Sequence, residues 1–200
     1  MTIEGYDPHE AALRDEAGEI QRELGLGPRL ARIGRATVVG SVALRVVVAR
    51  DLDLTVAVDR LDGTTRRRIA ELAAELLQHE RVREVLMRDD TGTWNTDPSY
   101  PDGIYLRLVA RAATGHDWSL DIWFVDEPGR QPDLAHLATI GPRIDVEAQA
   151  AILTIKRYLA EHPHPHPERI PSFDVYRAVL NDGVREPAAF LAGRVRGRHG

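Results

Sequence analysis

Residues 51–59, DLDLTVAVD, alternate strictly between apolar side chains and polar or small ones. A repeat of two is the period of a half-buried β-strand, whereas a helix repeats about every 3.6 residues. Asp51 and Asp53 therefore point to the same side of the strand, with Cα atoms roughly 6.5 Å apart. The opposite side is apolar and consists of Leu52, Leu54, Val56 and Val58. The stretch predicts a strand with two acids on one face.

Further strands and helices are interleaved along the chain. A short buried strand is predicted to end at Gly40, and Asp7 and Pro8 mark the start of the first helix. By hydrophobic periodicity, the other strands lie at 83–90, 103–112 and 116–128, and the helices at 7–24, 65–79, 131–138, 146–162, 173–182 and 186–195. The order favours an α/β or α+β core with a mixed sheet, and we assign the α+β class.

The character of the chain changes near residue 130. A chain of 200 residues can form one compact domain with a small helical companion. Because only helices are predicted beyond this point, we expect the sheet and the N-terminal helix in residues 1–130 and a helical region in 131–200. The sequence HPHPHPERIP at 162–171 predicts an extended, polyproline-like connector, in which alternate histidines do not converge on one metal ion.

Composition narrows the possible functions. The net charge of −5 argues against a general binder of nucleic acid or of anionic membranes, because phosphates are held by excess positive charge. No apolar run approaches the roughly 20 residues that span a bilayer, and acids occupy the N-terminal segment where a signal peptide would be basic. We therefore expect a cytoplasmic protein. The absence of cysteine excludes thiolate nucleophiles and thiolate zinc sites.

Three acids are candidate metal ligands. Asp51 and Asp53 repel each other unless a cation lies between them, and Mg²⁺ prefers such oxygen ligands together with water or phosphate oxygens. Asp121 lies in the predicted strand 116–128 and could complete a metal site if the two strands are neighbours. Taken singly, each acid is also consistent with a solvated strand face.

Gly40 and Ser41 end the strand that precedes the acids. A residue without Cβ lets a phosphate approach the backbone, and the amides that follow and the Ser41 hydroxyl could donate hydrogen bonds to it. The alternative is that the serine only caps a helix.

The sequence VVGSVALRVVVARDLDLTV, followed later by LDIWFV, resembles the nucleotidyltransferase superfamily with the DNA polymerase β-like palm, in its small antibiotic-modifying or minimal form. The resemblance covers about residues 30 to 127. It implies a mixed sheet flanked by helices, with Asp51, Asp53 and Asp121 as catalytic ligands of two Mg²⁺ ions. It also implies that Gly40 and Ser41 receive the β- and γ-phosphates of a nucleoside triphosphate.

Two features depart from the family pattern. The chain lacks the second glycine after Gly-Ser and the serine before the first aspartate that many small members have. In addition, the β-branched residues of Val46–Val48 predict a strand where the family has a short helix. Lys156, the only lysine, lies on a predicted helix. By analogy with antibiotic-modifying members it would meet the nucleotide phosphates, and the alternative is a surface lysine.

The loop at 91–102 and its neighbourhood carry the rings of Trp94, Tyr100 and Tyr105. These rings could stack on a base, or could cover the edge of a core.

The resemblance implies transfer of a nucleoside monophosphate, with AMP from ATP expected, to a hydroxyl of a small-molecule acceptor with release of pyrophosphate. A nucleic-acid acceptor is not expected. The alternatives are a protein-AMPylating antitoxin and a catalytically silent nucleotide-binding module. The C-terminal helices could complete the site in the same chain or across a homodimer.

Overall fold

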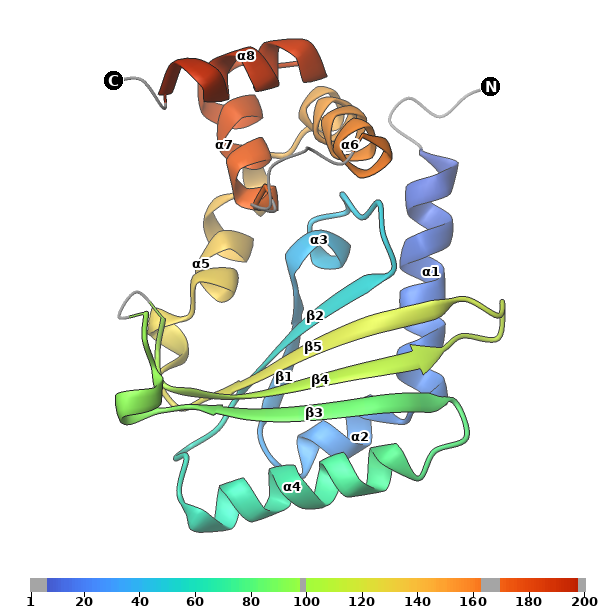
Figure 1. Cartoon of the computed structure of the whole chain (residues 1–200), viewed down its shortest axis with the longest axis vertical. Helices are drawn as coiled ribbons and strands as arrows, with labels where there is room; N and C mark the ends of the chain where they lie inside the picture. The colour runs from blue at the N-terminus through green and yellow to red at the C-terminus, as the bar shows by residue number, and fades with distance from the viewer. Residues whose placement is uncertain (1–6, 98–99, 163–169, 198–200) are drawn as a thin grey trace.

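A computed structural model describes residues 7–97, 100–162 and 170–197. At its centre lies a five-stranded mixed sheet with the strand order β1-β2-β5-β4-β3 (Figure 1). Strands β2 and β5 are parallel, and the other neighbouring pairs are antiparallel. The predicted α+β class with a mixed sheet is confirmed. The strands are β1 (Arg35–Val39), β2 (Asp51–Ala57), β3 (Val82–Asp90), β4 (Gly103–Arg111) and β5 (Asp117–Val125).

Helices pack against the sheet and at one end of the molecule. The first helix begins as predicted, because the Asp7 carboxylate accepts a hydrogen bond from the Glu10 amide at 2.9 Å. In Figure 1, α6 to α8 gather at the end of the molecule opposite α2 and α4, and α5 lies between the sheet and that end. The helices are α1 (Pro8–Glu23), α2 (Leu26–Ala31), α3 (Gly40–Ala43), α4 (Gly63–Leu77), α5 (Pro132–Thr139), α6 (Val146–Glu161), α7 (Ser172–Asp182) and α8 (Pro187–Gly197), with 3₁₀ turns at Gly92–Trp94, Pro128–Arg130 and Gly141–Arg143.

The strand predicted at Val46–Val48 is wrong, because this segment has no regular secondary structure. Side chains from α6 bind the backbone carbonyls that a strand ladder would need. The Lys156 ammonium donates to the Val46 carbonyl at 2.8 Å, and the Gln149 amide donates to the Arg45 carbonyl at 2.7 Å. The segment is therefore fastened to a helix. The short helix α3, which the family pattern includes, does follow β1, and α2 was not predicted.

The alternation along the strands sorts the sheet into two faces. Helices α1, α2 and α4 pack on the first face and form the main buried cluster with the even-numbered residues of β2, β4 and β5. The second face, which we call the open face, carries the odd-numbered residues of the same strands. Its polar and aromatic members include Asp51, Asp53, Tyr105, Arg107, Ser119, Asp121 and Trp123.

A second buried cluster lies among α5 to α8. It contains residues of α6, α7 and α8 together with Ile140, and also Leu44 and Val46 from the segment between α3 and β2. The segment 44–48 thus links the two clusters. The division of the chain at residue 130 stays a prediction, and residues 163–169 of the predicted connector, with His164 and His166, lie outside the described residues.

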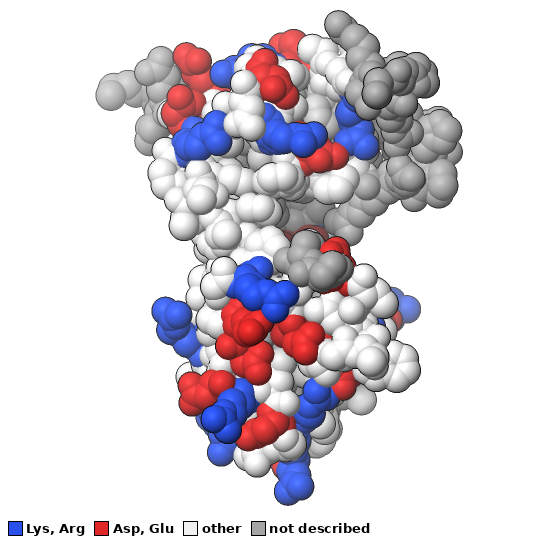
Figure 2. Space-filling model, turned by 90° about the vertical axis from the view of Figure 1, so that its left-hand side faces the viewer, with Lys and Arg blue, Asp and Glu red and all other residues white. Residues whose placement is uncertain are grey.

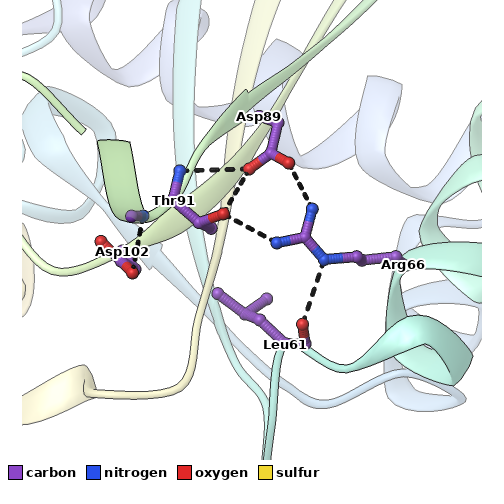
Figure 3. A network of polar contacts seen from close by, with 6 residues as sticks. Leu61, Arg66, Asp89, Thr91 and Asp102 are labelled. Carbon is purple, nitrogen blue, oxygen red and sulfur yellow. Dashed lines mark hydrogen bonds and ion pairs between the residues drawn. The ribbon is translucent and has the colours of Figure 1, made fainter. Parts of the chain in front are cut away.

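The loop between β3 and β4 is tied to α4 (Figure 3). The Arg66 guanidinium donates to the Leu61 carbonyl at 3.1 Å, to the Thr91 hydroxyl at 2.7 Å and to the Asp89 carboxylate. At the other end of the loop, the Gly92 amide donates to the Asp102 carboxylate at 2.9 Å. These contacts hold both ends of the loop that carries Tyr100.

Among the described helices, none combines the length and the apolar character needed to cross a bilayer.

We expect Leu106→Ala to lower the free energy of unfolding by about 2–5 kcal/mol, because Leu106 is fully buried on the helix-covered face. Val109→Ala on the same strand is the matched control, since Val109 lies half-buried on the open face. Its cost should stay below about 1 kcal/mol. Urea unfolding of both variants measures the difference, and equal losses would contradict this assignment of faces.

Candidate active site

The turn from β1 into α3 lies against Asp53. Gly40 has a φ of 63°, a left-handed conformation that favours glycine. A Cβ at this position would overlap the Asp53 carboxylate, which the register places opposite Val39. The glycine of the Gly-Ser pair is therefore required by the close approach of Asp53. Ser41 follows at the start of α3.

Parallel pairing brings the three acids together. Asp53 on β2 stands in register with Asp121 on β5, and Asp51 lies two residues earlier on the same face. One carboxylate oxygen from each residue lies within 4.8 Å of the others. The two strands are thus neighbours, which was the condition for a common site. Among the described residues, these three form the group of carboxylates that could hold a metal ion.

Negative charge is concentrated at Asp53, because Asp51, Asp121 and Asp133 all lie near it. Burial, together with the charges of Asp51, Asp121 and Asp133, raises the pKa of the Asp53 carboxyl to about 7, and the charge of Lys156 acts in the opposite direction. A bound divalent cation would stabilise the ionised form of this buried carboxyl, because the cation offsets both the repulsion between the acids and the lost hydration. The donor set consists of hard carboxylate oxygens and suits Mg²⁺.

A cavity of about 640 Å³ opens beside the acids. Figure 2 shows that the surface is drawn in at a waist between an upper and a lower part of the molecule. The lining comes from both: Gly40, Ser41, Leu44, Val48, Ala49, Asp51 and Asp53 from β1 to β2, Tyr100 from the β3–β4 loop, and Asp133, His136, Lys156, Leu159, Ala160, Ile170, Pro171, Ser172, Phe173, Val175 and Tyr176 from α5 to α7 and the residues before α7. One chain thus supplies these walls.

Lys156 faces this cavity and is half-buried, unlike a lysine on an exposed surface. Its ammonium lies 5.7 Å from the centre of the Tyr176 ring, besides its bond to the Val46 carbonyl. Of the predicted site residues, the structure brings Gly40, Ser41, Asp51, Asp53 and Lys156 to one cavity. Asp121 adjoins Asp53 but lies outside the cavity lining.

The three rings proposed for the loop have different positions. Trp94 is 71% exposed, and Tyr100 lines the cavity. Tyr105 lies within β4, where its hydroxyl donates to Asp121 at 2.8 Å. Burial, followed by the hydrogen bond to Asp121 and the charge of Asp121, raises the pKa of the Tyr105 hydroxyl, which therefore stays protonated as a donor.

Four titratable or aromatic residues of the cavity lining were not identified in the sequence analysis. Asp133 and His136 come from α5, and Phe173 and Tyr176 from α7. His136 and Phe173 stack with ring centres 4.6 Å apart. Their spacing along the chain carries no motif, because α5 and α7 meet only in the folded molecule. An acid in the first turn of α5 also has an ordinary reading as a favourable charge at a helix N-terminus.

Comparison with solved structures finds nucleotidyltransferase folds. A structure of a cytoplasmic RNA terminal U-transferase matches with a TM-score of 0.55 and 18% identity, over 83% of this chain and 48% of that chain. A mutant of the Cid1 poly(U) polymerase bound to MgATP matches with a TM-score of 0.57 and 20% identity, over 83% of this chain and 50% of that chain. This chain therefore spans about half the length of these structures. No protein-family model and no curated sequence matches it.

At these identities the likeness concerns the fold. The chain has the mixed-sheet palm fold of the polymerase β-like nucleotidyltransferases, as the Gly-Ser and aspartate pattern predicted.

Replacing Gly40 by alanine should destabilise the protein and displace Asp53, because the added methyl group meets the carboxylate at a left-handed backbone position. A loss of about 1–3 kcal/mol is expected from strain and crowding. Gly18→Ala, in the middle of α1 with open space around the new methyl group, should instead be neutral or stabilising. Urea unfolding separates the two, and the same effect from both would contradict the close approach.

The raised pKa of Asp53 predicts a pH-dependent stability in metal-free buffer. The folded protein keeps a proton on this carboxyl up to about pH 7, whereas the unfolded chain releases it near 3.8. The free energy of unfolding should therefore fall between about pH 4 and 7 and level off above. Asp53→Asn lacks this loss, so its melting temperature should exceed that of the wild type increasingly over that interval. Mg²⁺ should reduce this difference in melting temperature between the variant and the wild type. A difference that does not change with pH would contradict the raised pKa of Asp53.

Proposed function

We propose that the chain, which has the fold of the polymerase β-like nucleotidyltransferases, is a Mg²⁺-dependent nucleotidyltransferase of the cytoplasm. The observation that carries the proposal is the convergence of the Asp51, Asp53 and Asp121 carboxylates within 4.8 Å, beside a cavity of about 640 Å³. Pockets for nucleotide-sized ligands have volumes on the order of 300–1,000 Å³. Asp51 and Asp53 would bind both ions of a two-ion site, and Asp121 one of them.

When bound, the ions would stabilise the charge on the attacking and leaving oxygens of an in-line displacement. The acceptor hydroxyl would give its proton to the Asp121 carboxylate, its oxygen would attack the α-phosphorus, and the bond from the α-phosphorus to the bridging oxygen would break as pyrophosphate leaves. Gly40 leaves the backbone accessible to the β- and γ-phosphates, and Ser41 offers a hydroxyl donor. Lys156 would exchange its bond to the Val46 carbonyl for a phosphate oxygen, because an ammonium binds a phosphate more strongly than a neutral carbonyl.

The other end of the cavity suits the nucleoside. Phe173 is 41% exposed and lines the cavity next to Ser172. A base can stack on its ring if the His136 ring, which now stacks there, moves away. Tyr100 and Tyr176 line neighbouring parts of the cavity. This arrangement supports a nucleoside triphosphate as donor, and we propose ATP.

We propose a hydroxyl of a small molecule as acceptor. Asp51, Asp53 and Asp133 make the cavity acidic, and the whole chain carries a net charge of −5, which favours a cationic acceptor over a polyanion. A second candidate is the 3′ hydroxyl of an RNA, because the matched structures include an RNA terminal U-transferase and a poly(U) polymerase.

The first test is a thermal-shift panel of ATP, GTP, CTP and UTP, with and without Mg²⁺, on the wild type and Asp53→Asn. A ligand at about 100 times its Kd adds roughly 2.7 kcal/mol, or about 5–10 °C for a chain of this size. We expect one or more nucleotides to raise the melting temperature of the wild type only with Mg²⁺. The asparagine variant should lose this gain.

The acceptor is then identified with the α-labelled nucleotide that binds. Transfer of label to an aminoglycoside or polyamine alcohol supports the small-molecule proposal, and transfer to an RNA oligonucleotide supports the second candidate. Labelling of a protein would indicate AMPylation. Binding without transfer to any acceptor would favour a silent nucleotide-binding module, and no Mg²⁺-dependent shift with any nucleotide would refute the enzyme proposal.

A further inference from the structure

Asp121 does not pair with the cation that stands opposite it. In the antiparallel register of β4 and β5, Arg107 directly faces Asp121, whereas Tyr105 faces Trp123 and reaches Asp121 diagonally. Directly opposed residues have Cβ atoms about 4.5–5.5 Å apart, and an opposite-charge pair at this distance is normally favourable. The structure departs from that expectation, because the Asp121 carboxylate accepts a hydrogen bond from the Tyr105 hydroxyl at 2.8 Å.

The Arg107 side chain binds to β3, on the side of β4 away from Asp121. Its Nη2 donates to Glu84 on β3 at 3.0 Å. Its Nε is buried and has no hydrogen-bond partner in the described part of the chain. A buried guanidinium nitrogen without a partner costs free energy, so the side chain retains a donor that the neighbouring Asp121 could satisfy. An ion pair between Arg107 and Asp121 is therefore the competing arrangement.

The Tyr105 ring is fixed by its neighbours on the open face. It lies 5.0 Å from the Trp123 ring, and the Arg88 guanidinium lies 4.8 Å from its centre on the β3 side. Arg88 is itself held by the Asp90 carboxylate, with contacts of 2.9 and 2.6 Å. A ring held on two sides directs its hydroxyl with little conformational freedom.

We infer that Tyr105 and Glu84 are positioning residues that keep Asp121 out of an ion pair with Arg107 and directed toward Asp51 and Asp53. The difference between the two partners is chemical. An arginine fork can occupy both carboxylate oxygens and neutralise the charge. A tyrosine hydroxyl satisfies one oxygen and leaves the negative charge available to a cation. The consequence for metal binding rests on the proposed function, whereas the preference of Asp121 for Tyr105 over Arg107 does not.

The test measures Mn²⁺ affinity by electron paramagnetic resonance in the wild type, Tyr105→Phe and the double variant Tyr105→Phe/Arg107→Met. Loss of a residue that orients a metal ligand typically weakens metal binding by about 10–100-fold, so Tyr105→Phe should lie in that range. Removing Arg107 in the same protein removes the competing partner and should restore most of the affinity. Glu84→Gln should weaken binding in the same direction, and Tyr158→Phe on α6 is a control that should not change it.

The rescue separates positioning from general damage, because a merely structural loss would not be recovered by a second deletion. Wild-type affinity in Tyr105→Phe, or a double variant as weak as the single one, would overturn the inference.

A crystal structure of Tyr105→Phe provides a readout that does not depend on the metal. We expect the Asp121 carboxylate to turn to the Arg107 Nε, and an unchanged Asp121 would overturn the inference. If the wild type binds no Mn²⁺ but Asp121 turns to Arg107 in the variant, the proposed function fails while the positioning role stands.

Discussion

The parallel pairing of β2 with β5 is the constraint on which both the core and the site depend. On one face, this register buries Leu52 against Leu120 and brings Leu54 beside Ile122, and each such side chain contributes about 1.5–3 kcal/mol on burial. On the other face it forces Asp53 and Asp121 side by side. A slip of one residue would exchange the faces, so the apolar pattern that stabilises the sheet also fixes the acids in place. The repulsion is thereby tolerated in the folded chain.

The cavity depends on how α6 is attached to the sheet. Lys156 and Gln149 bind the carbonyls of the segment between α3 and β2, and the Arg157 guanidinium donates to the Asp7 carboxylate at 2.7 Å. Leu44 and Val46 of that segment pack into the second buried cluster. These contacts hold the helical wall over the acids. They also place the sole lysine of the chain in the wall of the cavity that Gly40, Ser41, Asp51 and Asp53 line.

The arginines beside the metal-ligand candidates pair with other carboxylates, which leaves Asp53 and Asp121 able to bind a cation. Arginines are frequent on the open face, yet Arg88 is held by Asp90 and Arg107 by Glu84. Asp121 accepts a hydrogen bond from a neutral donor, and Asp53 has a raised pKa because it is buried and has acidic neighbours. An ion pair at either aspartate would stabilise the sheet but would occupy the oxygens that a metal ion needs. The observed arrangement keeps that capacity at a cost in stability.

The sequence alone determined the alternating strands, the α+β class and the common direction of Asp51 and Asp53, because these follow from local periodicity. It also identified Gly40 as a site residue, because the Gly-Ser pair and the aspartates form a motif of fixed spacing. It missed the irregular path of Val46–Val48, since the partners of those carbonyls lie some hundred residues away on α6. Asp133, His136 and Phe173 carried no signal for the same reason. Only the tertiary structure decided that Tyr105, and not Arg107, is the partner of Asp121. That choice depends on the register of three strands and on the rings and acids that each strand brings beside the other.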